Sequence, residues 1–322
     1  MDLTLIARVL CLVSFLIFGI RTMRNALESS GDGLFTKALA QCTKNDVFAV
    51  LSGTLVTALV QSSAAITVTV VGLADAKKLP LRSAIGVILG ANVGTCVTGW
   101  ITGLAGINGA AAIFSAYNIA GIAAAAGIVL LTATGKKNAG NALIGFALTI
   151  SSVSSLSRTL EPLSRLEGFK TAFTLFENPL AGIVIGALVT AILQSSAASI
   201  GILQAACAGG GVTLAAAVPV ILGQNIGTTV TALIASAGAS ISAKRAAFIH
   251  FFVNLLGAAV FMVIFFSLRF SSLGAAFSRP VDAAGIAGFH TWFNVLSTLV
   301  MIPFIPVLEK AALGIGRSEE EA

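Results

Sequence analysis

Long apolar stretches alternate with short polar segments along the whole chain. An apolar helix needs about 20 residues to cross the hydrocarbon core of a bilayer, so stretches of this length predict membrane-spanning helices. The expected spans are residues 3–20, 80–102, 108–132, 138–157, 213–236, 246–268 and 286–307. The pattern therefore predicts an all-α polytopic membrane protein.

Two further apolar stretches, residues 47–75 and 179–208, are long for one span and have Gln-Ser-Ser at their centre. A polar tripeptide is costly to leave facing lipid. Each stretch therefore predicts a re-entrant helical hairpin, which enters and leaves on one side with its tip near the midplane. One kinked span apiece is the alternative. The preceding segments, 22–44 and 158–178, mix apolar with charged positions and predict helices lying along the membrane surface.

The chain also repeats itself. Residues 53–98 align with residues 186–231 without a gap, and 21 of the 46 positions are identical. With hairpins that do not cross the membrane, the first half crosses three times and the second half starts on the opposite face, so inverted repeats are expected. The polar matches are Thr57 with Thr190, Gln61-Ser62-Ser63 with Gln194-Ser195-Ser196, and Asn92, Gly94, Thr95 and Thr98 with Asn225, Gly227, Thr228 and Thr231.

The predicted organisation follows from this repeat. The first repeat covers residues 1–136, with a span, a hairpin and two spans. The second, inverted repeat covers residues 137–310 and has one extra span, and residues 311–322 form a tail. Each repeat is expected to contain a re-entrant hairpin and a broken transmembrane helix.

Composition and charge place the chain in lipid. Hydrophobic residues make up 57% of the chain and charged residues only 10%, with a mean hydropathy of +0.98. The net charge of +6 comes from Lys and Arg in short loops, where they set membrane orientation, so nucleic-acid binding is rejected. Most of these loops lie on one predicted face. That face, with the carboxyl terminus, is expected to be cytoplasmic, and the protein is expected in the plasma membrane.

The two hairpin tips predict an ion site made without formal charge. Where the first arm of a hairpin ends, its last carbonyls lack helical partners and suit a cation such as Na⁺. Where the second arm begins, free N–H groups and hydroxyls suit an anion. No Arg or Lys is expected at the site, so the charge that compensates an anion is expected from bound cations. The tip residues are Gln61, Ser62 and Ser63 in the first repeat and Gln194, Ser195 and Ser196 in the second.

A second polar motif, Gly-x-Asn-x-Gly-Thr, lies inside the span that follows each hairpin. Paired glycines around an Asn weaken a helix and predict an unwound turn against the hairpin tip. The alternative is that these small residues only let neighbouring helices pack closely. However, four polar blocks recur at the same spacing in the two repeats, which favours a ligand site. The expected anion ligands are Ser62, Ser63, Asn92, Thr95, Ser195, Ser196, Asn225 and Thr228, and the expected sodium ligands are Gln61, Ser63, Asn92, Gln194, Ser196 and Asn225.

The two motifs together resemble those of the type II sodium-dependent phosphate cotransporters and their bacterial relatives, over residues 10–310. The resemblance rests on the repeated Gln-Ser-Ser tips with Gly-Ala-Asn-Val-Gly-Thr and Gly-Gln-Asn-Ile-Gly-Thr. It implies sodium-driven uptake of inorganic phosphate, with both tips lining the site, sodium as the coupling ion and no other cofactor. The sequence departs from the family where a third tip serine is expected, because Ala64 and Ala197 stand there.

A third element, aromatic-rich, repeats a His and an Asn four residues apart. The two side chains share one helix face and could bond across to a neighbouring helix, so a structural role is favoured. A proton-linked role for His250 is the alternative. Thr57 and Thr190 are assigned a similar accessory role. The copies are His250 with Asn254, His290 with Asn294, and a weaker echo at Asn118 that lacks the His.

Secondary active transport is the leading functional hypothesis. A carrier for another oxyanion, such as sulfate or arsenate, and a passive anion channel are the alternatives. An intramembrane enzyme is disfavoured, because no Ser-His-Asp constellation, HExxH motif or paired carboxylate lies within the spans. The expected partners are phosphate, sodium and the lipid bilayer, and a homodimer is left open.

Overall fold

A computed structural model describes residues 3–31, 33–40, 45–104, 115–164, 166–271 and 274–315. The regular elements in these ranges are helices. In chain order they are α1 (Leu3–Ser30), α2 (Leu34–Ala40), α3 (Asp46–Val60), α4 (Ser63–Asp75), α5 (Leu81–Gly103), α6 (Ala116–Thr132), α7 (Lys137–Ser164), α8 (Glu167–Thr174), η3 (Leu175–Glu177), α9 (Pro179–Leu193), α10 (Ser196–Cys207), α11 (Leu214–Thr228), α12 (Val230–Ser236), α13 (Ile241–Arg269), α14 (Gly274–Phe277), α15 (Ala283–Met301), η4 (Ile302–Phe304) and α16 (Ile305–Leu313).

Six helical segments in the described ranges are long and apolar enough to cross a membrane. They are α1, α5, α7, α11 with α12, α13, and α15 through α16. The prediction of an all-helical, multi-pass membrane protein is therefore confirmed. The predicted span over 108–132 appears as α6, although residues 108–114 lie outside the described residues, as do residues 316–322 of the tail.

Two predicted surface segments are partly wrong, because α1 continues to Ser30 and α7 to Ser164. The reason is the packing of these two helices on each other. A Cβ at Gly19 would come within 3.0 Å of the backbone of α7, and one at Gly145 would overlap the backbone at Met23. This close contact supports α1 beyond its apolar run. Only α2, and α8 with η3, form separate helices in those segments, and residues 41–44 and 165 lie outside the described residues.

Both Gln-Ser-Ser stretches lie where one short helix ends and another begins. Gln61 and Gln194 adopt the left-handed conformation, with φ of 59° and 49°, and so end α3 and α9. Each first helix has 15 residues, or about 22 Å, which is short of the hydrocarbon thickness of about 30 Å. The structure therefore shows a helix break at each predicted tip, while the re-entrant path and the inverted relation of the halves stay predictions.

The predicted unwound turn in the following spans is wrong for the first repeat. α5 is unbroken through Gly90 and Gly94, whereas α11 ends at Thr228 and α12 begins at Val230, so that one residue separates them. The glycines serve close packing instead. A Cβ at Gly90 would overlap the carbonyl of Val50, and the glycines of α11 lie equally close to the backbone of α9. Small residues let membrane helices approach closely, and this is the role the glycines have here.

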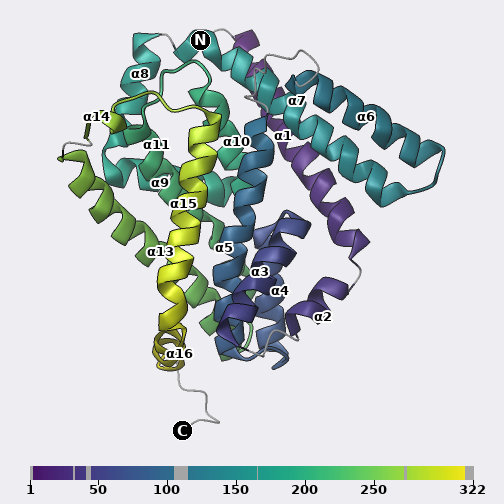
Figure 1. Cartoon of the computed structure of the whole chain (residues 1–322), viewed down its shortest axis with the longest axis vertical. Helices are drawn as coiled ribbons and strands as arrows, with labels where there is room; N and C mark the ends of the chain where they lie inside the picture. The colour runs from purple at the N-terminus through teal and green to yellow at the C-terminus, as the bar shows by residue number, and fades with distance from the viewer. Residues whose placement is uncertain are drawn as a thin grey trace.

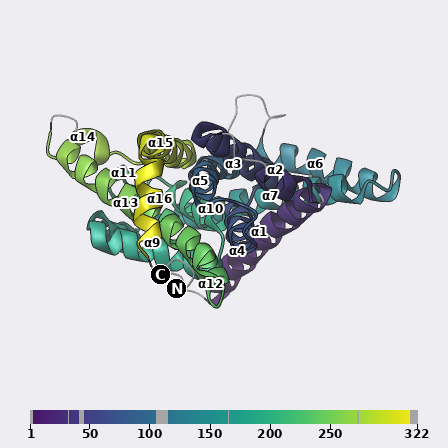
Figure 2. The same cartoon turned by 90° about the horizontal axis from the view of Figure 1, so that it is seen from below.

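The helices are arranged around α5, which packs against α3, α4, α10, α13 and α15. In Figure 1 the pair α3 and α4 lies toward the end of the molecule that holds the carboxyl terminus, and α9 and α10 lie nearer the end that holds the amino terminus. Seen from below, α6 and α7 extend to one side and α13 and α14 to the other (Figure 2). The two helix pairs thus lie toward different ends of the molecule.

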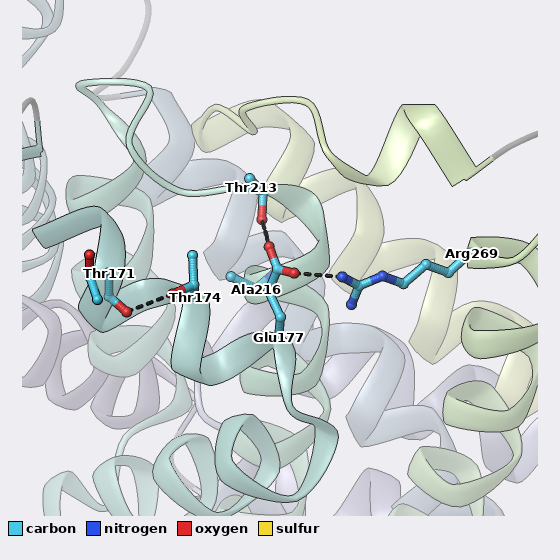
Figure 3. Close-up of polar contacts among 6 residues, drawn as sticks. All are labelled: Thr171, Thr174, Glu177, Thr213, Ala216 and Arg269. Atoms are coloured by element: carbon cyan, nitrogen blue, oxygen red, sulfur yellow. Dashed lines mark hydrogen bonds and ion pairs between the residues drawn. The ribbon is translucent and has the colours of Figure 1, made fainter. Parts of the chain in front are cut away.

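An ion pair ties the base of the first helix pair to α5, and another ties the base of the second helix pair to the end of α13. At the start of α3, Asp46 accepts two hydrogen bonds of 2.8 Å from Arg82 at the start of α5. Just before α9, Glu177 lies 2.5 Å from Arg269 and accepts a 3.0 Å hydrogen bond from the hydroxyl of Thr213, which caps α11 (Figure 3). Each base is therefore connected to a neighbouring helix by an ion pair.

Candidate functional site

Both helix breaks line one small cavity, here called the tip cavity. Its volume is about 20 Å³, which is room for about one water molecule. All six predicted tip residues line it, as do the threonines of the Gly-x-Asn-x-Gly-Thr motifs. The lining residues are Gln61, Ser62, Ser63 and Ala64 from the first tip, Gln194, Ser195, Ser196 and Ala197 from the second, Thr95 and Thr98 from α5, Thr228 from α11, and Ile20 and Arg24 from α1.

The first tip is held in place by hydrogen bonds. The backbone N–H of Gln61 donates to the Thr57 carbonyl at 2.8 Å. The Gln61 side-chain amide donates to the carbonyl of Ala58, and its oxygen accepts a 2.9 Å hydrogen bond from the hydroxyl of Thr98. Gln61 and Thr98 are both buried. These contacts fix a non-glycine residue in a backbone conformation that costs about 1 kcal/mol or more.

The second tip is more open. Gln194 is exposed, and it lines a second, larger cavity together with Thr231, the repeat equivalent of Thr98. The hydroxyl of Thr231 donates to the carbonyl of Thr228 at 3.0 Å instead of holding the glutamine. Deeper in this tip, the hydroxyl of Thr190 donates to that of Ser199 at 2.9 Å. The two repeats therefore carry the same residues in different contacts.

The larger cavity, here called the vestibule, has a volume of about 430 Å³ and adjoins the tip cavity. The two cavities share three lining residues, Arg24, Ala64 and Gln194. The rest of the vestibule is formed by α1, α4 and α12. It gives the tip cavity an approach on one side of the molecule.

Two helices begin at the tip cavity, and their free N–H groups carry partial positive charge toward it. Ser62 caps α4 by accepting from the N–H of Ala65 at 3.1 Å, and Ser195 caps α10 by accepting from the N–H of Ala198 at 3.2 Å. The next residues, Ser63 and Ser196, begin the helices and are buried at the cavity. Two helices also end here, and their last carbonyls carry partial negative charge. The site can therefore stabilise an anion and a cation side by side.

Two predicted ligands, Asn92 and Asn225, are not among the described residues that line the tip cavity. The Asn92 side-chain amide donates to the Asn254 side-chain oxygen at 3.3 Å, and that of Asn225 donates to the Asn294 oxygen at 3.1 Å. The amide groups of Asn254 and Asn294 each donate to the carbonyl four residues earlier, at 2.8 Å. The structure thus joins the second and third sequence motifs into two matching helix-to-helix contacts behind the cavity.

The two histidines of the third motif are fully buried. His290 Nε2 lies 3.2 Å from the Asn225 side-chain oxygen, whereas neither ring nitrogen of His250 has a hydrogen-bond partner among the described residues. Asn118 is exposed near the start of α6, away from both contacts. These bonds are of the kind expected from residues that connect helices, and the accessory role of the motif stays a prediction.

Two polar residues that line the tip cavity were not assigned to the site from the sequence. Arg24 was assigned to a loop flank, because the apolar run ends at residue 20, yet it lies within α1 and lines the tip cavity. The expectation that no Arg or Lys lies at the site is therefore wrong. Thr98 was visible as a match between the repeats, and this signal could have assigned it to the site.

Comparison with known proteins agrees with this arrangement. The family model described as Na+/Pi-cotransporter matches the chain twice, over residues 15–158 and 150–279. The chain belongs to the Na+/Pi-cotransporter family. The uncharacterized protein YqeW of Bacillus subtilis is 29% identical over 299 residues, covering 91% of this chain and 92% of YqeW.

Two further relatives have names that state an activity. The "Putative inorganic phosphate export protein YjbB" of Escherichia coli is 25% identical over 313 residues, covering 96% of this chain, and this chain spans about half of that protein, 55%. The "Sodium-dependent phosphate transport protein 2A" of Ovis aries is 34% identical over 99 residues, which are 28% of this chain and 16% of that protein. No solved structure matches the chain.

Proposed function

We propose that the chain is a secondary active transporter that couples sodium influx to the transport of inorganic phosphate across the plasma membrane. The observation that carries the proposal is that both Gln-Ser-Ser tips, with Thr95 and Thr228, line one cavity. The names of the family and of two relatives point to the same substrates. The carboxyl terminus is proposed to lie on the cytoplasmic side, from the distribution of Lys and Arg.

The proposed division of labour follows the polarity of the helix ends. Phosphate is bound by the N–H groups and hydroxyls that begin α4 and α10, from Ser62, Ser63, Ser195 and Ser196, and by the threonine hydroxyls. Sodium is bound by the terminal carbonyls of α3 and α9 with the oxygens of Gln61 and Gln194, which are neutral ligands of the kind used at broken helices. Asn92 and Asn225 support the site from behind through their contacts with Asn254 and Asn294.

Coupling arises because each ion improves the site for the other. An anion moved away from water needs nearby positive charge, and a cation next to the anion supplies part of it. Each positive charge that moves inward through the full field gains about 2.3 kcal/mol per 100 mV. Sodium therefore provides both binding energy for phosphate and a driving force for transport.

Uptake of radiolabelled phosphate into proteoliposomes tests the proposal. A sodium gradient is imposed inward, outward or not at all, at constant ionic strength, and liposomes without protein are the blank. We expect accumulation of phosphate above its equilibrium level only with a sodium gradient. Simple equilibration without sodium dependence would indicate a passive anion channel.

The same liposomes decide between oxyanions and between directions. Sulfate and arsenate are added as competitors, and a carrier for either would show stronger competition than unlabelled phosphate. Release of preloaded phosphate is measured in parallel, because YjbB is named for export. Sodium-independent movement in both directions would refute the coupling, even though the family assignment stands.

A further inference from the structure

Arg24 lies where the tip cavity meets the vestibule. It is on α1, one turn after Ile20, which also lines the tip cavity. It is one of three residues that line both cavities, and the other two are Ala64 and Gln194 from the two tips. Arg24 is therefore a basic side chain placed next to both Gln-Ser-Ser tips.

The guanidinium of Arg24 has an unusual environment for a cation. Its Nε atom is buried and has no hydrogen-bond partner among the residues that the structure describes. Glu28 follows one turn later and lines the vestibule, but no ion pair joins the two side chains in the described part of the chain. Arg24 as a whole is half-buried, but a buried donor atom left without a hydrogen-bond partner is costly. Such a group suits a site that receives an anion as the missing partner.

The sizes of the two cavities indicate where such an anion fits. The tip cavity has a volume of about 20 Å³, room for about one water molecule, so a tetrahedral oxyanion held by the serines of the two tips extends toward the vestibule. The vestibule, at about 430 Å³, has ample room for one. An oxyanion held at the helix N-termini and extending toward the vestibule comes to the junction of the two cavities, where Arg24 lines both.

We propose that Arg24 is an anion-binding residue, whose guanidinium pairs with the transported oxyanion at the junction of the tip cavity and the vestibule. This inference rests on the proposed function and adds a fixed positive charge to it. Arginine is suited to this task because its planar fork donates two parallel hydrogen bonds to a phosphate-like group. Gln194 also lines both cavities, so Arg24 and the second tip meet at this junction.

Binding of phosphate to the purified, full-length protein tests the proposal. The phosphate Kd is measured by calorimetry in saturating sodium for the wild type, R24Q, R24K and R21Q. Arg21 is the matched control, because it is exposed on the same helix and lines neither cavity. We expect R24Q to raise the Kd about tenfold to a hundredfold. R24K should raise it less, because lysine keeps the charge but loses the fork, and R21Q should leave it unchanged.

The melting temperature of each variant, measured without phosphate, separates binding from folding. A raised Kd in R24Q with an unchanged melting temperature and partial rescue in R24K supports the proposal. If R24Q does not fold, a raised Kd in well-folded R24K supports it, and an unchanged Kd there refutes it. Equal losses in R24K and R24Q with lowered melting temperatures would show a structural role and refute it. If the wild type transports phosphate and the phosphate Kd of R24Q is unchanged, only the role of Arg24 is refuted. If the wild type neither binds nor transports phosphate, the proposed function is refuted.

Discussion

The substitution Thr98→Val tests whether the conformation of the first tip is held by a single side-chain contact. Valine has nearly the same shape as threonine but lacks the hydroxyl that donates to the Gln61 side-chain oxygen at 2.9 Å. Thr98 is 2% exposed and Gln61 is 8% exposed, so bulk solvent does not reach the contact, and the tip cavity beside it has room for about one water molecule to replace the lost donor. A buried acceptor left unpaired costs about 1–3 kcal/mol.

This cost falls on the conformation that presents the tip to the cavity. Gln61 already adopts a left-handed backbone, with φ of 59°, so the tip depends on its side-chain contacts to stay in place. A loss of about 1.4 kcal/mol weakens binding tenfold. We therefore expect T98V to weaken sodium-dependent phosphate binding about tenfold to a hundredfold.

Calorimetric titration of phosphate at several sodium concentrations is the appropriate assay, because transport also depends on other conformations of the cycle. The repeat provides the matched control, Thr231→Val. The hydroxyl of Thr231 donates to the Thr228 carbonyl and does not hold Gln194, so T231V should change the Kd by less than about threefold, as expected for a substitution worth at most ~0.5 kcal/mol. Equal effects of T98V and T231V, or no effect of T98V, would refute the reasoning.

Three further predictions concern the tips, the contacts behind them and the base of the second helix pair. Ser63→Ala and Ser196→Ala should each weaken phosphate transport about tenfold to a hundredfold. The control Lys78→Ala, at an exposed position, should not weaken it. Unchanged apparent affinities for phosphate and sodium in both serine variants would show that these two serines are not part of the site. Asn225→Ala removes the donor to one helix contact and should lower the free energy of unfolding by about 1–3 kcal/mol, seen as a lower melting temperature. Glu177→Gln breaks a half-buried ion pair and should cost about 1–2 kcal/mol at low salt and less at high salt; a melting temperature equal to the wild type at low salt would contradict this.

Much of the fold follows from sequence because two strong signals coincide. Apolar length predicts the spans, and the repeated Gln-Ser-Ser blocks predict the two breaks, which lie at Gln61 and Gln194 in the structure. The bounds of α9 also match those of α3 when the aligned repeats are superimposed. A polar block inside an apolar stretch is costly unless it meets other polar groups. The prediction that both tips face one cavity therefore had a direct physical basis.

Other features depend on tertiary contacts that a sequence does not specify. Glycine pairs can weaken a helix or let two helices pack closely. At Gly90 the close approach of the Val50 carbonyl shows that the glycine serves packing. Asn92 and Thr95 are three residues apart and share a helix face. Only the position of Asn254 on α13 shows that the asparagine bonds away from the cavity that the threonine lines.

In the proposed site, the position of Arg24 changes the charge balance between sodium and phosphate. Without a fixed cation, all the charge that compensates a phosphate must come from sodium ions. With Arg24 at the junction, the protein itself supplies one positive charge, and a divalent phosphate needs one fewer sodium ion to be neutralised. Arg24 does not cross the membrane, so the charge that moves in each cycle is set by phosphate and sodium alone. For a divalent phosphate, two sodium ions give no net moved charge, whereas one sodium ion gives a net charge of −1, so the change by one unit is worth about 2.3 kcal/mol per 100 mV and makes an inside-negative potential oppose uptake. The arginine therefore links the composition of the site to the driving force of the carrier.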